Sequence, residues 1–242
     1  MAVTFPLAKL LFRYMNGKDC MKMKRKITAC LFSLLALLFC SCSPEIVFQA
    51  IGADDARLSF QTGFSAATEK TLKSIMGSVS GAVDEAAPLV STNDIKLIMQ
   101  SAGFEDITAA GDRRDRIGSE GVVHEVSQHS LSAAGVLART EKSLTLTFGP
   151  RQFQELYGMV TEEAQAYFDL LMIPSLNEDE QTVAEYNELL ASVYGQSFAD
   201  EITGGKVKLS LRSPDGKKST DVSISLGELL TLKEAKSWTV KW

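Results

Sequence analysis

The only two histidines of the chain lie close together, in the segment His124-Glu-Val-Ser-Gln-His129. Two histidines with a glutamate between them are the side chains with which metalloproteases bind zinc and activate water. In those enzymes the histidines stand four residues apart on a helix, so that both imidazoles share one face. Here they stand five residues apart, which separates them by about 140° around a helix and sends them to opposite faces of a strand. We therefore predict no zinc protease site.

The sequence also lacks other motifs that carry catalysis. It contains no G-x-S-x-G nucleophile elbow, no G-x-x-x-x-G-K-[ST] phosphate loop and no G-x-G-x-x-G fingerprint. The segment Asn177–Glu180, with three acidic residues, has the composition of a calcium loop but lacks its glycine and its 12-residue register, and a helix N-terminus explains it better. We therefore expect that the protein is not an enzyme and binds no metal ion and no cofactor. A hydrolase that uses His124 or His129 is the least favoured alternative.

The segment Met21–Ser43 has the organisation of an export signal. An apolar run of 13 residues, Ile27–Phe39, follows a basic flank and leads into small residues. A helix needs about 20 apolar residues to span a bilayer, so a permanent transmembrane helix is the weaker interpretation. The basic residues are Lys22, Lys24, Arg25 and Lys26.

The end of this segment resembles the signal of bacterial lipoproteins. Such a signal ends in a lipobox, in which an aliphatic residue and one or two small residues precede a cysteine that is acylated and becomes the first mature residue. The matching residues here are Phe39-Cys40-Ser41-Cys42, and Phe39 departs from the usual leucine as in the looser lipoboxes of spirochaete lipoproteins. The resemblance covers the first 43 residues. It implies lipidation at Cys42, or at Cys40 in the alternative register; an ordinary cleaved signal peptide is the other alternative.

Lipidation would place the chain in the bacterial cell envelope. Each buried methylene contributes about 0.8 kcal/mol, and two or three acyl chains such as palmitate hold a protein stably where one does not. We therefore expect attachment to the inner or the outer membrane through the N-terminal lipid, with the remaining chain in the periplasm or at the cell surface.

Processing before Cys42 would change the composition of the chain. All four cysteines (Cys20, Cys30, Cys40 and Cys42) lie in the first 42 residues, so the mature form would have no free thiol and no disulfide. Of the 25 basic and 30 acidic residues, seven basic and one acidic lie in residues 1–41. The mature form would thus carry 18 basic and 29 acidic residues, a formal net charge of −11, which excludes nucleic acid as a partner.

We divide the chain into four parts. Residues 1–20 are a misassigned start, 21–41 the signal peptide, 42–56 a lipidated tether and 57–242 a folded α+β domain, with an antiparallel sheet and helices packed on it. Strand, helices and strands recur twice after residue 57. This pattern suggests two similar halves, 57–142 and 143–242, as one of two interpretations of the domain.

Hydrophobic periodicity predicts the elements of this domain. Alternation of apolar and polar residues predicts strands, and apolar residues three and four apart predict helices. A capping box at Ser175–Glu178 is expected to start the last helix, and 111–118 is expected to be an exposed loop. The predicted strands are 57–64, 104–110, 122–127, 143–148, 207–211, 222–226 and 238–242, and the predicted helices are 66–79, 94–102, 151–172 and one that carries 183–194.

The sequence thus predicts a membrane-anchored lipoprotein whose domain is a non-catalytic binding or envelope-structural module. The alternative is a carrier of a small apolar ligand or lipid, which the Phe, Tyr and Met content allows. An apolar cavity of several hundred Å³ would favour the carrier, and a filled core would favour the module. The sequence names neither a protein partner nor a ligand-binding residue.

Overall fold

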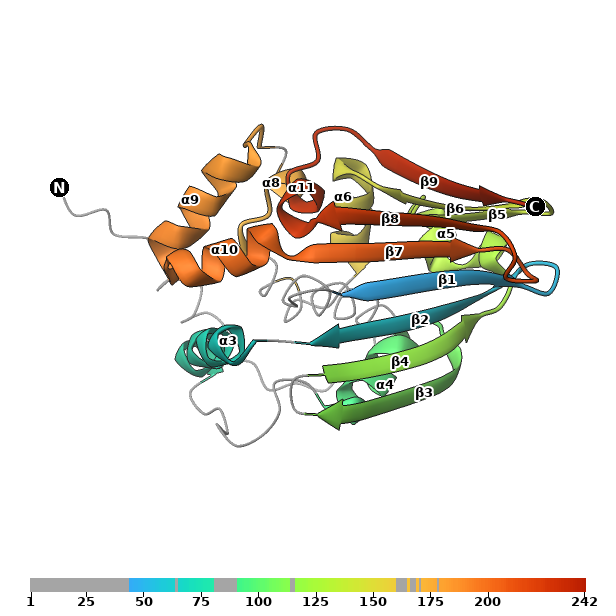
Figure 1. Ribbon diagram of the computed structural model, residues 1–242, viewed down its shortest axis with the longest axis horizontal. Helices are drawn as coiled ribbons and strands as arrows, with labels where there is room; N and C mark the ends of the chain where they lie inside the picture. The colour runs from blue at the N-terminus through green and yellow to red at the C-terminus, as the bar shows by residue number, and fades with distance from the viewer. Residues whose placement is uncertain are drawn as a thin grey trace, which may run out of the picture.

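The computed structural model describes residues 44–63, 65–80, 91–113, 116–159, 165, 169, 171–177 and 179–242. Two sheets with helices packed against them confirm the predicted α+β class (Figure 1). The larger sheet has the strand order β3-β4-β2-β1-β7-β8, and the smaller has the order β5-β6-β9. The lipid-anchor signal predicted from the sequence lies outside the described residues, and no helix in the described part of the chain is long and apolar enough to cross a bilayer.

The strands follow the alternation of apolar and polar residues. Their bounds are β1 Glu45–Ile51, β2 Asp55–Gly63, β3 Glu105–Arg113, β4 Arg116–Val123, β5 Leu137–Thr140, β6 Ser143–Phe148, β7 Lys206–Arg212, β8 Ser219–Ser225 and β9 Lys236–Lys241. In β2 and β6 every second residue is buried, as expected for strands with one face on the core.

The helices gather behind the larger sheet and at one end of it. Their bounds are α3 Ala66–Ser80, α4 Thr92–Ser101, α5 Ser130–Ala133, α6 Pro150–Met159, α8 Pro174–Asn177, α9 Val183–Tyr194, α10 Gln196–Gly204 and α11 Leu226–Leu230, with a 3₁₀ turn η1 at Val126–Gln128. In Figure 1, α4 lies behind β3 and β4, whereas α3, α9 and α10 lie at the end opposite the C-terminus.

The larger sheet is mixed, not wholly antiparallel as predicted. β1 and β7 run parallel, with Ile46 opposite Leu209, whereas the other neighbours in this sheet are antiparallel. A parallel pair needs a long crossover, and the chain between β1 and β7 provides it. Local periodicity cannot reveal this pairing because the two strands are about 160 residues apart in sequence.

The segment predicted as a tether contains the central strand β1. Ile46, Phe48 and Ala50 are at most 7% exposed and point into the core, so the folded domain begins before residue 57. The segment Glu-Ile-Val-Phe-Gln-Ala-Ile directly follows the predicted signal, and three consecutive apolar residues, Ile46, Val47 and Phe48, obscure its alternation of apolar and polar residues.

The two suggested halves share one sheet and one core. β1 pairs with β2 of the first half and with β7 of the second, while β5 of the first half pairs with β6 of the second. Buried side chains of both halves form a single hydrophobic cluster. Its members include Phe48, Leu58, Phe60, Met99, Leu144, Leu146, Phe153, Tyr186, Leu209 and Leu211.

Three local predictions also differ from the structure. The expected loop at 111–118 contains the end of β3 and the start of β4, and the expected strand at 122–127 ends at Val123, before η1. The capping box lies at Thr182, whose hydroxyl accepts from the N–H of Glu185, and not at Ser175. Ser175 lies inside the short helix α8, where its buried hydroxyl donates to the carbonyl of Leu232 at 2.9 Å, and Glu178 of the predicted box lies outside the described residues.

Candidate functional site

The first candidate site is the point at which the chain enters the domain. Cys42, the predicted lipidation site, lies outside the described residues. Pro44 is buried, and its carbonyl oxygen accepts a hydrogen bond from the main-chain N–H of Lys208 at 2.9 Å. The strand β1 then starts at Glu45, opposite Lys208 in β7. The entry point is therefore held to the middle of the larger sheet.

The two histidines belong to different environments. His124 is exposed at the end of β4, and its Nδ1 atom lies 3.1 Å from Oδ2 of Asp55. The other oxygen of Asp55 accepts a hydrogen bond from the N–H of Glu125, whose φ of +49° is left-handed. Glu125 therefore turns the chain out of β4. As the spacing of five residues predicted, the two imidazole rings do not share a face, and each has a different partner.

His129 is the N-cap of the short helix α5. Its Nδ1 atom accepts a hydrogen bond from the N–H of Leu131 at 3.2 Å, so the proton of the neutral ring is on Nε2. Nε2 is buried, with no acceptor in good hydrogen-bond geometry. Gly103, with φ +86°, leaves room for it, because a Cβ there would lie 2.8 Å from Nε2.

Burial lowers the pKa of His129, and this effect outweighs the nearby main-chain groups of Ala102 and Gly103, which raise it. The ring also meets Phe104 edge-on, with centroids 6.0 Å apart. His129 therefore caps α5 through its neutral ring. Among the described residues, no group of three or more His, Cys, Asp or Glu side chains is placed to hold a metal ion.

A polar cluster surrounds the turn between β1 and β2. The Arg139 guanidinium donates from Nη2 to the carbonyl of Gly52 at 2.8 Å and from Nε to the carbonyl of Ala53 at 3.2 Å. It also lies 5.2 Å from the ring centroid of Trp242, a distance at which a cation and an aromatic face attract each other. Asp54 accepts from the hydroxyl of Ser127 at 2.5 Å. These contacts join the turn to β5 and to the end of the chain.

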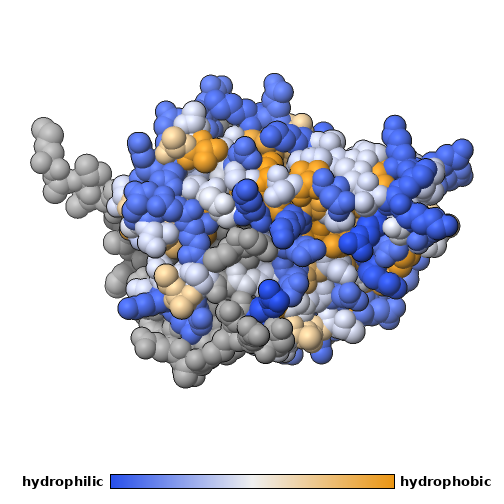
Figure 2. All heavy atoms as spheres, viewed as in Figure 1, coloured by the Kyte–Doolittle hydropathy of each residue, from blue (hydrophilic) through white to orange (hydrophobic). Residues whose placement is uncertain are grey.

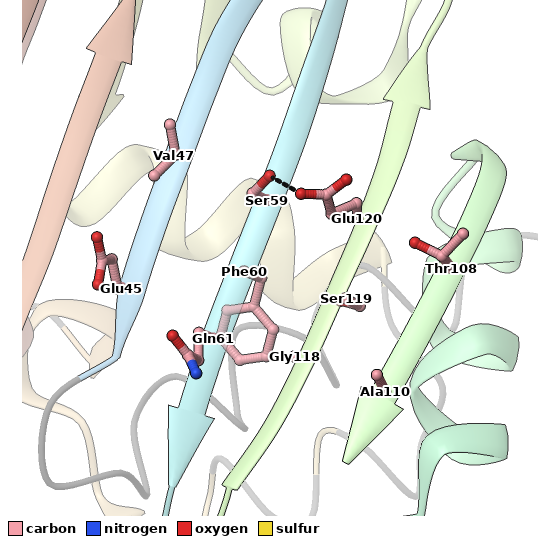
Figure 3. Close-up of a pocket in the computed structure, with 10 residues that line it drawn as sticks. All are labelled: Glu45, Val47, Ser59, Phe60, Gln61, Thr108, Ala110, Gly118, Ser119 and Glu120. Carbon is pink, nitrogen blue, oxygen red and sulfur yellow. Dashed lines mark hydrogen bonds between the residues drawn. The ribbon is translucent and has the colours of Figure 1, made fainter. Parts of the chain in front are cut away.

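The outer face of the larger sheet carries an open hollow of about 420 Å³ (Figure 3). It extends across β1, β2, β4 and β3, and the Ser59 hydroxyl donates to the Glu120 carboxylate across it at 2.8 Å. Figure 2 shows this face of the molecule, on which hydrophilic side chains surround smaller hydrophobic areas. The lining residues are Glu45, Val47, Ser59, Phe60, Gln61, Thr108, Ala110, Gly118, Ser119 and Glu120.

The hollow carries several hydrogen-bonding groups. Its two carboxylates, Glu45 and Glu120, lie on different strands, with polar Ser59, Gln61 and Thr108 among them. Val47, Phe60 and Ala110 lie among these polar groups, so the hollow offers apolar contacts as well as hydrogen bonds.

No family of known proteins matches the chain, and no curated protein matches it.

No local pattern in the sequence marks the residues of the hollow. They come from four strands, and only the pairing of those strands brings them together. The one available signal was the alternation in residues 45–51, which would have placed Glu45 and Val47 on an outer face. No local sequence pattern marks Arg139, because its side chain donates to main-chain carbonyls of a turn about 86 residues earlier.

Proposed function

We propose that the protein is an exported lipoprotein, anchored to a membrane of the bacterial cell envelope through acyl chains on Cys42. Its α+β domain is a non-catalytic module that binds another envelope component or has a structural role there. The observation that carries the anchor is the order of residues in Met21–Ser43: a basic flank, 13 apolar residues, and Ser41 before Cys42.

The hollow on the outer sheet face supports a binding module over a carrier. A carrier of an apolar ligand needs an enclosed cavity, whereas this hollow is open to solvent and its apolar side chains are interrupted by polar ones. The inner face of the same sheet is packed, with Leu58 and Leu209 at most 3% exposed. The outer face is therefore the surface on which we expect a protein partner to bind.

The surroundings of the histidines support a non-catalytic role. A serine hydrolase needs a hydroxyl hydrogen-bonded to a histidine that a carboxylate orients. Asp55 lies beside His124 in this way, but among the described residues no hydroxyl bonds to that histidine. The nearby Ser127 hydroxyl bonds to Asp54 instead.

Acylation is tested by expressing the full chain in a bacterium that processes lipoproteins and supplying labelled palmitate. We expect incorporation into the wild type and into Cys40→Ser, but not into Cys42→Ser. The N-terminal peptide of the purified protein should begin at an acylated Cys42. A protein that carries no lipid and keeps its signal segment would disprove the anchor.

Module and carrier are distinguished with a version that begins at Pro44, secreted without an anchor. A carrier would retain an apolar molecule in amounts close to one per chain, measured by mass spectrometry of an organic extract. We expect no such molecule, and a stoichiometric lipid in this extract would replace the module by the carrier.

A further inference from the structure

We propose that the outer face of the larger sheet recognises an acidic segment of its protein partner through Arg57 and Arg212, which lie beside the hollow. This inference rests on the proposed function, which gives the outer face to a protein partner, and it assigns the chemistry of that partner. The two arginines do not line the hollow, but the register of the strands places them at its edge.

Arg212, Gln49 and Arg57 form one row across three adjacent strands, which we call the arginine row. Gln49 of β1 lies opposite Arg57 of β2 and opposite Arg212 of β7. Each of the three lies between two buried residues of the chain, so their side chains point to the outer face. Neighbouring strands are about 4.8 Å apart, which places the two arginines about 10 Å apart on either side of Gln49. Their long side chains can therefore bind one carboxylate or two neighbouring ones.

The guanidinium groups of this row are available to a partner. Both arginines are exposed, and neither makes a hydrogen bond or an ion pair within the residues that the structure describes. The Asp221 carboxylate near Arg212 instead accepts the hydroxyls of Ser210 and Ser219, at 2.6 Å each. Hydrogen bonds from these two serines lower the pKa of Asp221, and the charge of Arg212 adds to this effect. The row thus offers two planar donor groups whose geometry matches a carboxylate.

The charge of the outer face differs from that of the rest of the chain. The described side chains on its strands include five basic and five acidic ones, whereas the predicted mature chain carries 18 basic and 29 acidic residues. An acidic partner is repelled by most of the domain and meets least repulsion on this face. The basic residues are Arg57, Arg116, Lys206, Lys208 and Arg212, and the acidic ones are Glu45, Asp55, Glu105, Glu120 and Asp221.

The carboxylates of the hollow favour a protein over a uniformly anionic surface. Glu120 lies opposite Ser59, which is two residues or about 7 Å along β2 from Arg57. Glu45 lies four residues or about 13 Å along β1 from Gln49. Both carboxylates border the hollow on either side of β2 (Figure 3). A bilayer of anionic headgroups or an anionic polymer would place charge against them, whereas a protein can present acidic groups to the arginine row and neutral or basic groups to the hollow.

Gly118 keeps the floor of the hollow open. It lies opposite Gln61 of β2 and Ala110 of β3, and its φ is not positive. A Cβ at this position would meet the carbonyl oxygen of Phe60 at 3.4 Å, which is an ordinary van der Waals contact. The strand therefore accepts a larger side chain here, and Gly118→Val would fill the hollow without changing the backbone.

A library of random peptides displayed on phage is the probe for this face. The full chain, expressed in a bacterium that processes lipoproteins, is purified in detergent and immobilised for the selection. We expect the selected peptides to be rich in Asp and Glu and to carry at least one neutral or basic position between them. Synthetic copies are then titrated against the wild type and its variants, whose folding is checked by circular dichroism.

Charge reversal in the arginine row gives the decisive comparison. We expect Arg57→Glu and Arg212→Glu each to weaken peptide binding by about tenfold or more, because like charges then face each other. The matched control is Arg151→Glu, which reverses an exposed arginine on α6, a helix that packs on β6 and α8. It should change binding by less than about twofold, as expected for a charge remote from the site. Selected peptides without acidic residues, or equal effects of all three reversals, would overturn the proposal.

Soluble polyphosphate is the probe for a uniformly anionic partner. We expect it to compete poorly with the peptides, because Glu45 and Glu120 repel it. Polyphosphate that binds more tightly than every selected peptide, and that loses this affinity in Arg57→Glu, would replace the protein partner by an anionic polymer or surface.

Gly118→Val separates this inference from the proposed function. We expect it to abolish binding of the selected peptides. Peptides that Gly118→Val blocks but that neither charge reversal weakens contradict only the acidic partner. A selection without any peptide that Gly118→Val blocks contradicts the outer face as a binding surface, and with it that part of the proposed function.

Discussion

Nδ1 of His129 accepts the main-chain N–H of Leu131 at 3.2 Å, while Nε2 of the same ring is buried against the backbone of Gly103. The contact at Nδ1 needs the neutral ring, because only an unprotonated nitrogen can accept a hydrogen bond. A second proton on Nδ1 would break the helix cap and place a charge beside the packed ring of Phe104.

The first prediction concerns the pH dependence of stability. Burial lowers the pKa of His129 below its ordinary value of 6.5, so the unfolded chain takes up a proton that the folded chain resists. The contribution of His129 to the free energy of unfolding is therefore fully present above about pH 6.5 and decreases as the pH falls below it. We expect the wild type to lose more stability between about pH 7.5 and about pH 5.5 than His129→Asn, which keeps a capping oxygen but does not titrate. Urea unfolding at both pH values measures this, and equal losses would contradict it.

The second prediction concerns where the domain begins. A version that begins at Pro44 should fold, whereas a version that begins at Arg57 should not. Loss of β1 would remove the strand between β2 and β7 and expose both of its neighbours. Circular dichroism and resistance to protease measure folding. A stable, protease-resistant domain from Arg57 would restore the tether interpretation.

The third prediction compares the two faces of β1. Phe48 is 7% exposed on the core face, and Phe48→Ala should lower the free energy of unfolding by about 3–5 kcal/mol. The neighbouring Gln49 points to the other face, where it makes one long contact to the carbonyl of Pro214 at 3.4 Å. Gln49→Ala should change stability by less than about 0.5 kcal/mol. Similar losses in the two variants, measured by chemical unfolding, would mean that β1 is not packed as described.

The fourth prediction concerns Arg139. Arg139→Ala removes two hydrogen bonds to the carbonyls of Gly52 and Ala53, so we expect a loss of about 1–2 kcal/mol. Arg139→Lys should recover less than half of it, because a single ammonium cannot reproduce the planar fork or its contact with Trp242.

Hydrogen exchange localises the effect of Arg139. The N–H of Val126 donates to the carbonyl of Asp54 at 2.7 Å, so its protection reports on the β1–β2 turn. Protection should fall there in Arg139→Ala and stay unchanged in β7. Full rescue by lysine would mean that charge alone, and not the forked geometry, holds the turn.

The sequence determined the elements whose cause is local. Apolar residues alternate with polar ones in most of β2 and throughout β6, and this alternation alone predicts strands with one buried face. The stripe of Leu72 and its neighbours likewise predicted α3 to within a residue of its end. The positions of the four cysteines are also properties of the sequence, whereas the export signal and the lipidation stay predictions.

Two neighbouring segments have the spacing of a capping box, and the sequence alone does not show which of them starts a helix. Ser175 and Thr182 both precede an acidic residue three positions later, but only Thr182 caps a helix. Burial of Ser175 against Leu232 decides between them, and Leu232 is distant in sequence.

Only the tertiary structure decided the features that depend on non-local pairing. The parallel register of β1 and β7 turns the predicted tether into the centre of the sheet and holds Pro44 against Lys208. The hollow on the outer face and the cluster around Arg139 arise in the same way, from strands and turns far apart in the chain. The physical reason is that periodicity reports which face of a strand is buried but not which strand lies beside it.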